Sequence, residues 1–150
     1  MKDNNVFRPA SNIVKNSHVD EATYDQMYEE SVTSSEIFWN NHGKRIDWIK
    51  PYTKVSEVSY KKEDVHIKWY EDGTLNASFN CLDRHLKTKG ENIAIIWEGD
   101  DPNVSKHITY NQLHKDVCKF SNVLKKAGAQ KGDRITIYMP MIPEATIAML

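Results

Sequence analysis

The stretch ITYNQLHKDVCKFSNVLKKAGAQKGDRITIYMPMIPEATIAML, residues 108–150, holds the most regular pattern in the chain. Its first part repeats apolar residues every three or four positions, as in a helix that packs on one side. These residues are Tyr110, Leu113, Val117, Phe120, Leu124 and Ala127. Thr109 and Gln112 have the spacing of a capping box, in which each side chain accepts from the other residue's amide. The pattern predicts a long helix that Gly128 ends in the left-handed conformation.

The second part of this stretch predicts a strand and the start of another helix. Apolar and more polar residues alternate in RITIYM, residues 134–139, which is the period of a strand. Pro140 and Pro143 would end the strand and begin a helix that runs through EATIAML. No cap follows that helix, and its apolar residues have no later element to pack against. We therefore expect a chain that has been cut at Leu150.

The composition is that of a soluble globular protein, with 39% hydrophobic and 27% charged residues. A formal net charge of -1 provides no general attraction to nucleic acid or to an anionic membrane, so neither partner is expected. The N-terminus lacks the apolar segment of a signal peptide, and no apolar run is long enough to cross a bilayer. We expect a cytoplasmic protein in which Cys81 and Cys118 are reduced.

The first half of the sequence predicts a lead-in and an aromatic-rich extension. Residues 1–19 are polar and weakly patterned, which is typical of a flexible lead-in. A helix is predicted from Asp20, and a second short helix is predicted in SSEIFWNNH, capped by Ser34 or Ser35 and closed by Gly43. Many aromatic residues follow without regular spacing. Large rings in irregular backbone usually act as packing anchors, because they bury much apolar area for few rotatable bonds.

The middle of the chain predicts short elements that lead into an α/β domain. Residues 65–70 are a candidate strand, and Asn80 with Asp83 is expected to cap a helix over 81–89. IAIIWEG has the composition of a buried strand and is followed by a turn and SKHITY, so residues 93–110 predict a hairpin. From there the order is strand, strand, helix, strand, helix, which suits an α/β layer arrangement.

Two pairs of residues have the spacing of metal ligands on a helix. Cys81 and His85 lie four residues apart, and so do His114 and Cys118. A Cys2His2 set suits zinc. Structural zinc sites usually include a tight Cys-x-x-Cys knuckle, however, and the sequence has none. We therefore expect no metal here, and instead histidines that are satisfied or exposed together with buried thiols.

The charged clusters have the pattern of solvated surface. Glu98, Asp100 and Asp101 lack the alternating ligands of a calcium loop. The outer side of the long helix carries His114, Lys115, Lys119 and Lys126. Asp116 lies among these cations, which argues against a phosphate or nucleic-acid patch. There is no glycine-rich phosphate loop and no nucleophile elbow. The sequence therefore predicts no catalytic, cofactor-binding or metal-binding residue in this chain.

Several strings together resemble one enzyme family. They are SSEIFWNNHGKRIDWIKPYTKV at 34–55, IKWYEDGTLNASFNCLDRHL at 67–86, IAIIWEGDD at 93–101, ITYNQLHKDVCKFSNVL at 108–124 and KGDRITIYMPMIPEATIAML at 131–150. They resemble the N-terminal region of the AMP-forming acetyl-CoA synthetases, which are acetate:CoA ligases of the adenylate-forming superfamily. The resemblance covers about residues 20–150. It implies that residues 20–80 are the family's N-terminal extension and that 81–150 are the truncated beginning of its AMP-binding domain.

The resemblance implies a two-step ligase. Acetate and MgATP would give acetyl-adenylate and pyrophosphate, and the thiol of CoA would then take the acetyl group while AMP leaves. The family's phosphate loop, acyl pocket, CoA-contacting arginines and C-terminal lysine belong to sequence beyond position 150. No site residue is therefore carried over to this chain. We expect the 150 residues alone to be inactive and to bind ATP, Mg²⁺ and CoA at most weakly.

Two other interpretations stay open. A sister ligase for propionate or another short acid would share much of this N-terminal pattern, and the acyl pocket that separates the two is not in this chain. The other hypothesis is a truncated, non-catalytic module that binds another protein or associates with itself. The reason for this hypothesis is the predicted helix at the end of the chain, which leaves apolar surface unpaired.

Overall fold

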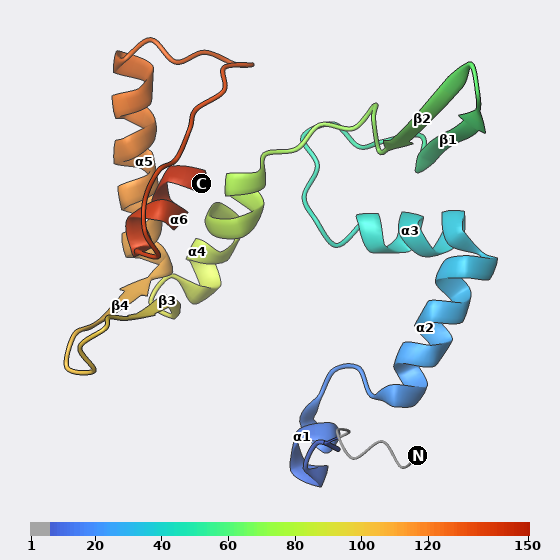
Figure 1. Ribbon diagram of the computed structural model, residues 1–150, viewed down its shortest axis with the longest axis horizontal. Coiled ribbons are helices and arrows are strands. Elements are labelled where there is room, and N and C mark those ends of the chain that lie inside the picture. Colours follow the sequence, from blue (N-terminus) through green and yellow to red (C-terminus); the bar gives the residue numbers. More distant parts are fainter. Residues whose placement is uncertain (1–6) are drawn as a thin grey trace. The chain divides into compact units, whose positions relative to one another are not determined.

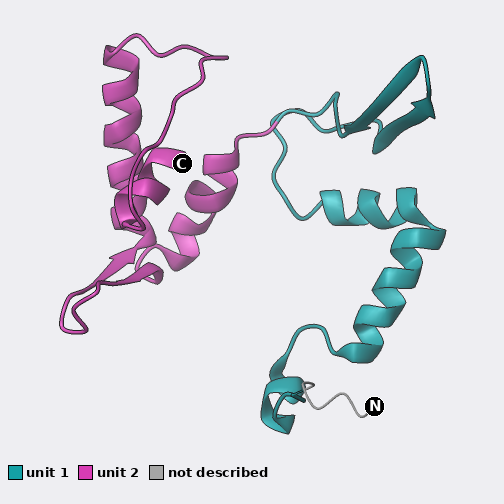
Figure 2. Ribbon diagram, viewed as in Figure 1, with its two compact units in different colours: residues 1–74 teal, residues 75–150 magenta. Residues whose placement is uncertain are grey.

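The computed structural model describes residues 7–150, which form two compact units that divide after Thr74 (Figure 2). The first unit is built from three helices and one hairpin, and the second from helical segments and a second hairpin (Figure 1). Both hairpins are antiparallel and two-stranded. The described chain thus mixes helices with small antiparallel strand pairs.

The first unit contains the two helices that the sequence predicts and, before them, a short helix that it does not predict. Its helices are α1 (Ser11–Asn16), α2 (Glu21–Thr33) and α3 (Ser35–Gly43). Asp20 caps α2, because its carboxylate accepts from the Thr23 amide at 2.8 Å. Ser34 occupies the capping position of α3 but makes no side-chain capping bond. Helix α1 lies within the predicted lead-in, and residues 1–6 of that lead-in lie outside the described residues.

Aromatic side chains satisfy the C-terminal end of α3. The last four carbonyls of a helix have no partner inside it. Here the Trp48 indole donates to the Gly43 carbonyl at 2.8 Å, and the Tyr52 hydroxyl donates to the Asn40 carbonyl at 2.8 Å. The two remaining carbonyls accept from backbone amides just beyond the helix. The prediction that rings anchor the irregular backbone holds for Trp48 and Tyr52, which form hydrogen bonds as well as packing contacts, and not for Tyr60, which is exposed.

Gly43 does end α3, but for a different reason from the one expected of a helix-closing glycine. Its φ is not positive. A Cβ at Gly43 would lie 2.5 Å from the Tyr52 hydroxyl oxygen, so glycine is needed for close approach.

A hairpin follows in the first unit. The predicted strand at 65–70 is confirmed as β2 (Asp64–Trp69), and it pairs with β1 (Ser56–Lys61), which the sequence analysis did not foresee. One face of the hairpin carries the cross-strand pairs Val58 with Ile67 and Tyr60 with Val65. The other face is polar. Phe38 and Val55 are the buried apolar residues of this unit.

The second unit contains η1 (Phe79–Asp83), α4 (Arg84–Lys89), β3 (Ile93–Glu98), β4 (Ser105–Thr109), α5 (Tyr110–Lys126) and α6 (Pro143–Met149). The helix predicted over 81–89 begins earlier and is irregular. Its cap is Asn76, whose side-chain oxygen accepts from the Phe79 amide at 3.0 Å, and not Asn80. The wide turn of η1 then replaces the first turn of the expected α-helix.

The predicted hairpin over 93–110 is confirmed as β3 and β4, but β3 is not a buried strand. Ile93 and Ile96 are 50% and 64% exposed. A fully buried strand needs neighbours on both edges and cover on both faces, whereas β3 has one partner strand.

Helix α5 matches its predicted bounds. Thr109 caps it by accepting from the Gln112 amide at 3.2 Å, which is half of the predicted capping box. The Gln112 side chain donates forward to Asp116 at 2.7 Å rather than reaching back. At the other end Gly128 has a φ of 91°, and the amides of Gly128 and Ala129 bond back to Lys125 and Leu124. This is the Schellman arrangement that the glycine predicted.

The predicted strand at 134–139 is wrong, because this segment is an irregular loop. A strand needs a partner for its backbone groups, and neither β3 nor β4 pairs with it. Helix α6 follows as predicted, with Pro143 in its first turn. Its apolar residues do have a packing surface. Ile147 and Leu150 lie against the core that Leu82, Leu113 and Val117 form, so an earlier part of the chain covers them.

Candidate functional site

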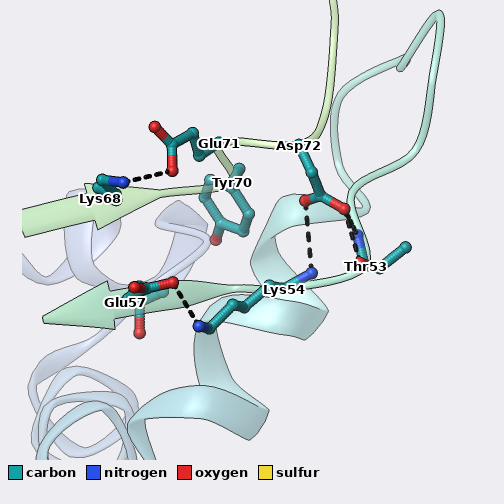
Figure 3. Close-up of a pocket in the computed structure, with 8 residues that line it drawn as sticks. Thr53, Lys54, Glu57, Lys68, Tyr70, Glu71 and Asp72 are labelled. Atoms are coloured by element: carbon teal, nitrogen blue, oxygen red, sulfur yellow. Dashed lines mark hydrogen bonds and ion pairs between the residues drawn. The ribbon is translucent and has the colours of Figure 1, made fainter.

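A small pocket of the first unit lies at the base of the β1–β2 hairpin (Figure 3). It has a volume of about 270 Å³. One side is lined by Thr53, Lys54, Ser56 and Glu57, and the other by Lys68, Tyr70, Glu71 and Asp72. Figure 3 shows its charged side chains pointing toward partners within the same group.

Asp72 ties the two sides together. Its carboxylate accepts from the Thr53 amide at 2.8 Å and from the Thr53 hydroxyl at 2.6 Å, and it accepts a longer bond from the Lys54 amide at 3.4 Å. The bonds from the Thr53 side chain and then its backbone hold the pKa of Asp72 below its usual value. Asp72 therefore fixes the loop that enters β1.

The remaining charges of this pocket form ion pairs. Lys54 pairs with Glu57, and Lys68 pairs with Glu71 at 3.1 Å. The hydrogen bond from Lys54 is the main cause of a lowered pKa at Glu57. The hydrogen bond to Glu71 is the main cause of a raised pKa at Lys68. These side chains are exposed, so each pair contributes little to stability.

Tyr70 closes the inner side of the pocket. It has a φ of 50°, which is unusual for a residue other than glycine. Its hydroxyl donates to the Trp39 carbonyl at 2.7 Å, and its ring packs against those of Tyr52, Trp48 and Trp69. Burial is the main cause of a raised pKa at Tyr70. The strained backbone is thus held by a well-packed ring.

This pocket is a structural junction. Asp72, Glu57, Lys68 and Glu71 each have a partner within it. The residues that line it include no cysteine or histidine that could act as nucleophile or base. We assign it no chemistry. The sequence predicts Asp72 only as part of a turn with Gly73, and it gives no signal for the bonds that Asp72 makes to Thr53.

His66 lies on the polar face of the same hairpin and also went unnoticed in the sequence. Its Nδ1 lies 3.0 Å from Asp64 Oδ1. Its Nε2 is buried without a hydrogen bond and lies 3.4 Å from Glu57 Oε1. Two acids therefore flank the ring.

The structure separates the four residues that had the spacing of a zinc site. His114 and Cys118 meet, with Sγ 3.5 Å from Nε2, whereas His85 packs its ring against Tyr110 at a centroid distance of 5.7 Å. Within residues 7–150, no group of three or more His, Cys, Asp or Glu side chains is arranged to hold a metal. Both thiols are exposed, so the expectation of buried cysteines is wrong.

The acidic loop is a turn. Asp101 accepts from the Asn103 amide at 2.9 Å and from its side chain at 3.0 Å, and the Gly99 amide bonds to the Val104 carbonyl. Asp101 therefore serves the connection between β3 and β4.

On the outer side of α5, charged side chains pair with neighbours on the same helix. Lys119 lies 3.2 Å from Asp116. The pKa of Asp116 is held low, first by the bond from Gln112 and then by Lys119. This face is solvated surface with local charge pairing.

Two family sequence models match the chain in succession. The one described as "Acetyl-coenzyme A synthetase N-terminus" matches residues 24–81, and the one described as "AMP-binding enzyme" matches residues 82–150. An acetyl-coenzyme A synthetase of Vibrio parahaemolyticus is 56% identical over all 150 residues. The chain belongs to the acetyl-CoA synthetase family.

The match to this family is close but covers part of each relative. An acetyl-coenzyme A synthetase of Methylocella silvestris is 62% identical over 136 residues, which are 91% of this chain and 21% of that protein. The Vibrio relative is covered to 23% of its length. The chain therefore spans between a fifth and a quarter of the length of these relatives, and it matches their N-terminal region.

A solved structure shares the fold. The acetoacetyl-CoA synthetase from Streptomyces lividans superimposes with a TM-score of 0.72 over 84% of this chain and 19% of that chain. The identity is 24%, so the likeness concerns the fold alone. Together with the family match, it places the chain in the adenylate-forming fold. None of the helices in the described part of the chain has the length and apolarity needed to cross a bilayer.

Proposed function

We propose that this chain is the N-terminal part of an ATP-dependent acetate:CoA ligase that forms acetyl-CoA through an acetyl-adenylate. The observation that carries the proposal is the 56% identity, over all 150 residues of this chain, to a protein named acetyl-coenzyme A synthetase. In such a ligase, adenylation replaces a poor leaving group on the carboxylate with AMP. The CoA thiol then attacks the activated carbonyl.

Within this proposal the chain supplies scaffold. Residues 1–19 serve as a lead-in, 20–80 as the N-terminal extension of the family, and 81–150 as the beginning of the adenylate-forming domain. The family match that changes from one model to the next after position 81 supports this division. In this proposal, helices α5 and α6 of the second unit pack against the rest of the enzyme's adenylate-forming domain.

ATP, Mg²⁺ and CoA act in the whole ligase, and the described residues do not fit Mg²⁺. Octahedral oxygen sites need carboxylates that converge, and no three acids of the described residues are arranged to hold a metal. Asp72, Asp101, Asp116, Glu57 and Glu71 instead bond to local amide, hydroxyl or lysine groups. We therefore assign no residue of this chain to the metal, and we expect the chain alone to bind none of these ligands tightly.

The test compares the 150-residue chain with the full-length protein that contains it. Acetate-dependent pyrophosphate release is expected from the full-length protein only, and calorimetry on the chain is expected to detect no submicromolar ATP binding. Turnover by the chain would contradict its scaffold role. A full-length protein that fails to release pyrophosphate with any short acid would contradict the ligase itself.

Acetate is the proposed substrate because the matched relatives are named acetyl-coenzyme A synthetases. Propionate is the main alternative, since the resemblance implies that the acyl pocket belongs to sequence beyond position 150. The same pyrophosphate assay, run with acetate and propionate at equal concentration, decides between them. A higher kcat/KM with propionate would assign the protein to the sister ligases.

The chain on its own is also proposed to associate with itself. Tyr138 and Met141 are 99% and 91% exposed in the loop that leads to α6, and Ile135 lies exposed nearby. Exposed apolar clusters of this kind promote association. Light scattering is expected to show concentration-dependent mass that Y138D reduces. A monodisperse monomer at all concentrations would rule this out.

A cytoplasmic location and the absence of a nucleic-acid partner complete the proposal. Both described cysteines are free, as in a reducing compartment, and the net charge is -1. A filter-binding assay with duplex DNA at low salt is expected to show no retention of the chain.

A further inference from the structure

A cysteine, a histidine and an aspartate meet on the surface of the second unit. Cys118 and His114 lie one turn apart on α5, and Cys118 Sγ is 3.5 Å from His114 Nε2. Asp83, at the end of η1, places Oδ1 3.3 Å from the same nitrogen. The three side chains come from segments about thirty residues apart, and neither the ligase chemistry nor the apolar core uses them.

These three residues line an open pocket of about 350 Å³. Asn76, Ser121 and Asn122 supply polar groups to its wall, and Lys125 supplies a positive charge. Val117 and Leu150 add apolar surface. The pocket therefore suits a small molecule that combines amide and carboxylate groups, since the amides and Lys125 can bond to such groups.

The other free thiol has a different environment. Cys81 is also exposed and also has a histidine four residues away, His85. The His85 ring packs against Tyr110 instead. Within residues 7–150, no hydrogen bond joins Cys81 to a base, so Cys81 is an internal reference for an exposed thiol in the same unit.

We propose that Cys118 is a site of thiol–disulfide exchange with small, anionic, peptide-like disulfides. His114 acts as the base that takes the thiol proton, because a thiolate and not a thiol is the nucleophile. Asp83 acts through His114. Its carboxylate lies 3.3 Å from Nε2 and stabilises the positive charge of the ring once His114 has taken the proton.

The exchange balances without an added reductant or oxidant. The Cys118 S–H bond breaks as its proton passes to His114 Nε2, and the sulfur attacks one sulfur of the incoming disulfide. The S–S bond of that disulfide breaks, and a new S–S bond forms to Cys118. The departing thiolate keeps the bonding electron pair and takes the proton back from His114. Cys118 is oxidised, and half of the small disulfide is reduced to a thiol.

The experiment measures the two thiols separately in the 150-residue chain. C81S leaves Cys118 as the only thiol, and C118S leaves Cys81. Each variant is mixed with excess glutathione disulfide, and intact mass spectrometry follows the mixed disulfide over time. Cys118 is expected to react on the order of tenfold faster than Cys81, in line with the low end of general-base assistance.

Replacement of the base gives the decisive comparison. H114Q in the C81S background is expected to slow Cys118 to the rate of Cys81, and D83N is expected to slow it less. H85Q in the C118S background is the matched control and is expected to change nothing. Adduct formation in urea is expected to proceed at one common rate for both thiols, which shows that the folded arrangement causes the difference.

Two results would overturn the proposal. One is equal reaction of Cys118 and Cys81 in the folded chain, and the other is full reactivity of Cys118 in H114Q. Should H114Q lose its helical circular dichroism, D83N takes its place, because it leaves α5 and its cap intact. An unchanged rate of Cys118 in folded D83N would then refute the arrangement.

Discussion

The two units of this chain are held together in different ways. In the second unit, three buried aliphatic side chains form one core, and α5 presents an apolar stripe to it. Among residues 7–74 of the first unit, Phe38 and Val55 are the only buried apolar residues. Two ring hydroxyls and an indole there bond to carbonyls of α3. The comparison shows that aromatic residues can organise irregular backbone where a regular apolar stripe is lacking.

This difference predicts where substitutions act. Removal of aliphatic volume should disturb the second unit, whereas a disturbed ring-to-carbonyl bond should disturb the first. Hydrogen exchange by mass spectrometry separates the units, because peptides from residues 7–74 and 75–150 report on each one. Global unfolding of a chain with two units is not described by one transition, so peptide-level measurements are preferable.

The largest effect is expected from L82A. Leu82 is 1% exposed and lies at the centre of the core with Leu113 and Val117. Loss of its side chain leaves a cavity and is expected to cost about 2 to 5 kcal/mol. Exchange should accelerate in peptides of α5 and η1 and stay unchanged in α3. The control is I96A, since Ile96 is exposed, and a loss as large as that of L82A would contradict the assigned core.

In the first unit, G43A should break the hydrogen bond from the Tyr52 hydroxyl to the Asn40 carbonyl of α3. The new methyl group would lie 2.5 Å from the Tyr52 hydroxyl and push it away from the Asn40 carbonyl. The combined strain and lost hydrogen bond are expected to cost about 1 to 3 kcal/mol. Exchange at the end of α3 is the measurement. In a Y52F background the penalty should shrink, and an equal penalty in both backgrounds would show that the hydroxyl contact is unimportant.

G128A tests the end of α5, and its cause is backbone conformation rather than contact. Gly128 has a φ of 91° and open space around its Cβ position. Alanine in this conformation is expected to cost about 1 to 2 kcal/mol. G128N should cost less, because asparagine tolerates left-handed backbone. Equal stability of all three proteins in thermal melts would argue against the Schellman cap.

D72N is expected to have the smallest effect at neutral pH and to change the pH dependence. The folded pKa of Asp72 lies below its ordinary value of 3.8, because Thr53 bonds to the charged form. Its contribution is therefore complete above about pH 4 and is lost as the pH falls through the lower, folded pKa. Near-ultraviolet circular dichroism measures the melting temperature of the first unit. Between pH 5 and pH 2, this temperature should fall less steeply in D72N than in the unchanged chain. Identical slopes of melting temperature against pH in both proteins would show that Asp72 does not contribute to the acid sensitivity.

Acid sensitivity should also be unequal between the units. Asp20, Glu57 and Asp72 have lowered pKa values in the first unit, and Asp116 has one in the second. Hydrogen exchange at pH 3, corrected for intrinsic rates, is expected to rise more in the first unit. A larger rise in peptides of α5 would reverse this expectation.

The sequence by itself determined what depends on neighbours within a few positions. The stripe, cap and terminal glycine of α5 lie within one stretch, and they specify the helix before any tertiary contact forms. The same holds for the Asp20 cap and for the β3–β4 hairpin. The family resemblance likewise needed only the order of residues.

Tertiary structure decided whatever required a distant partner. Residues 134–139 have the alternation of a strand, but no described strand pairs with them, and backbone groups without a partner do not form a sheet. The bonds from Trp48, Tyr52 and Tyr70 to α3 span irregular backbone that shows no periodicity. Asp83 reaches His114 only because η1 packs beside α5. Local patterns specify helices and caps, whereas pairing and side-chain clusters depend on which segments meet in space.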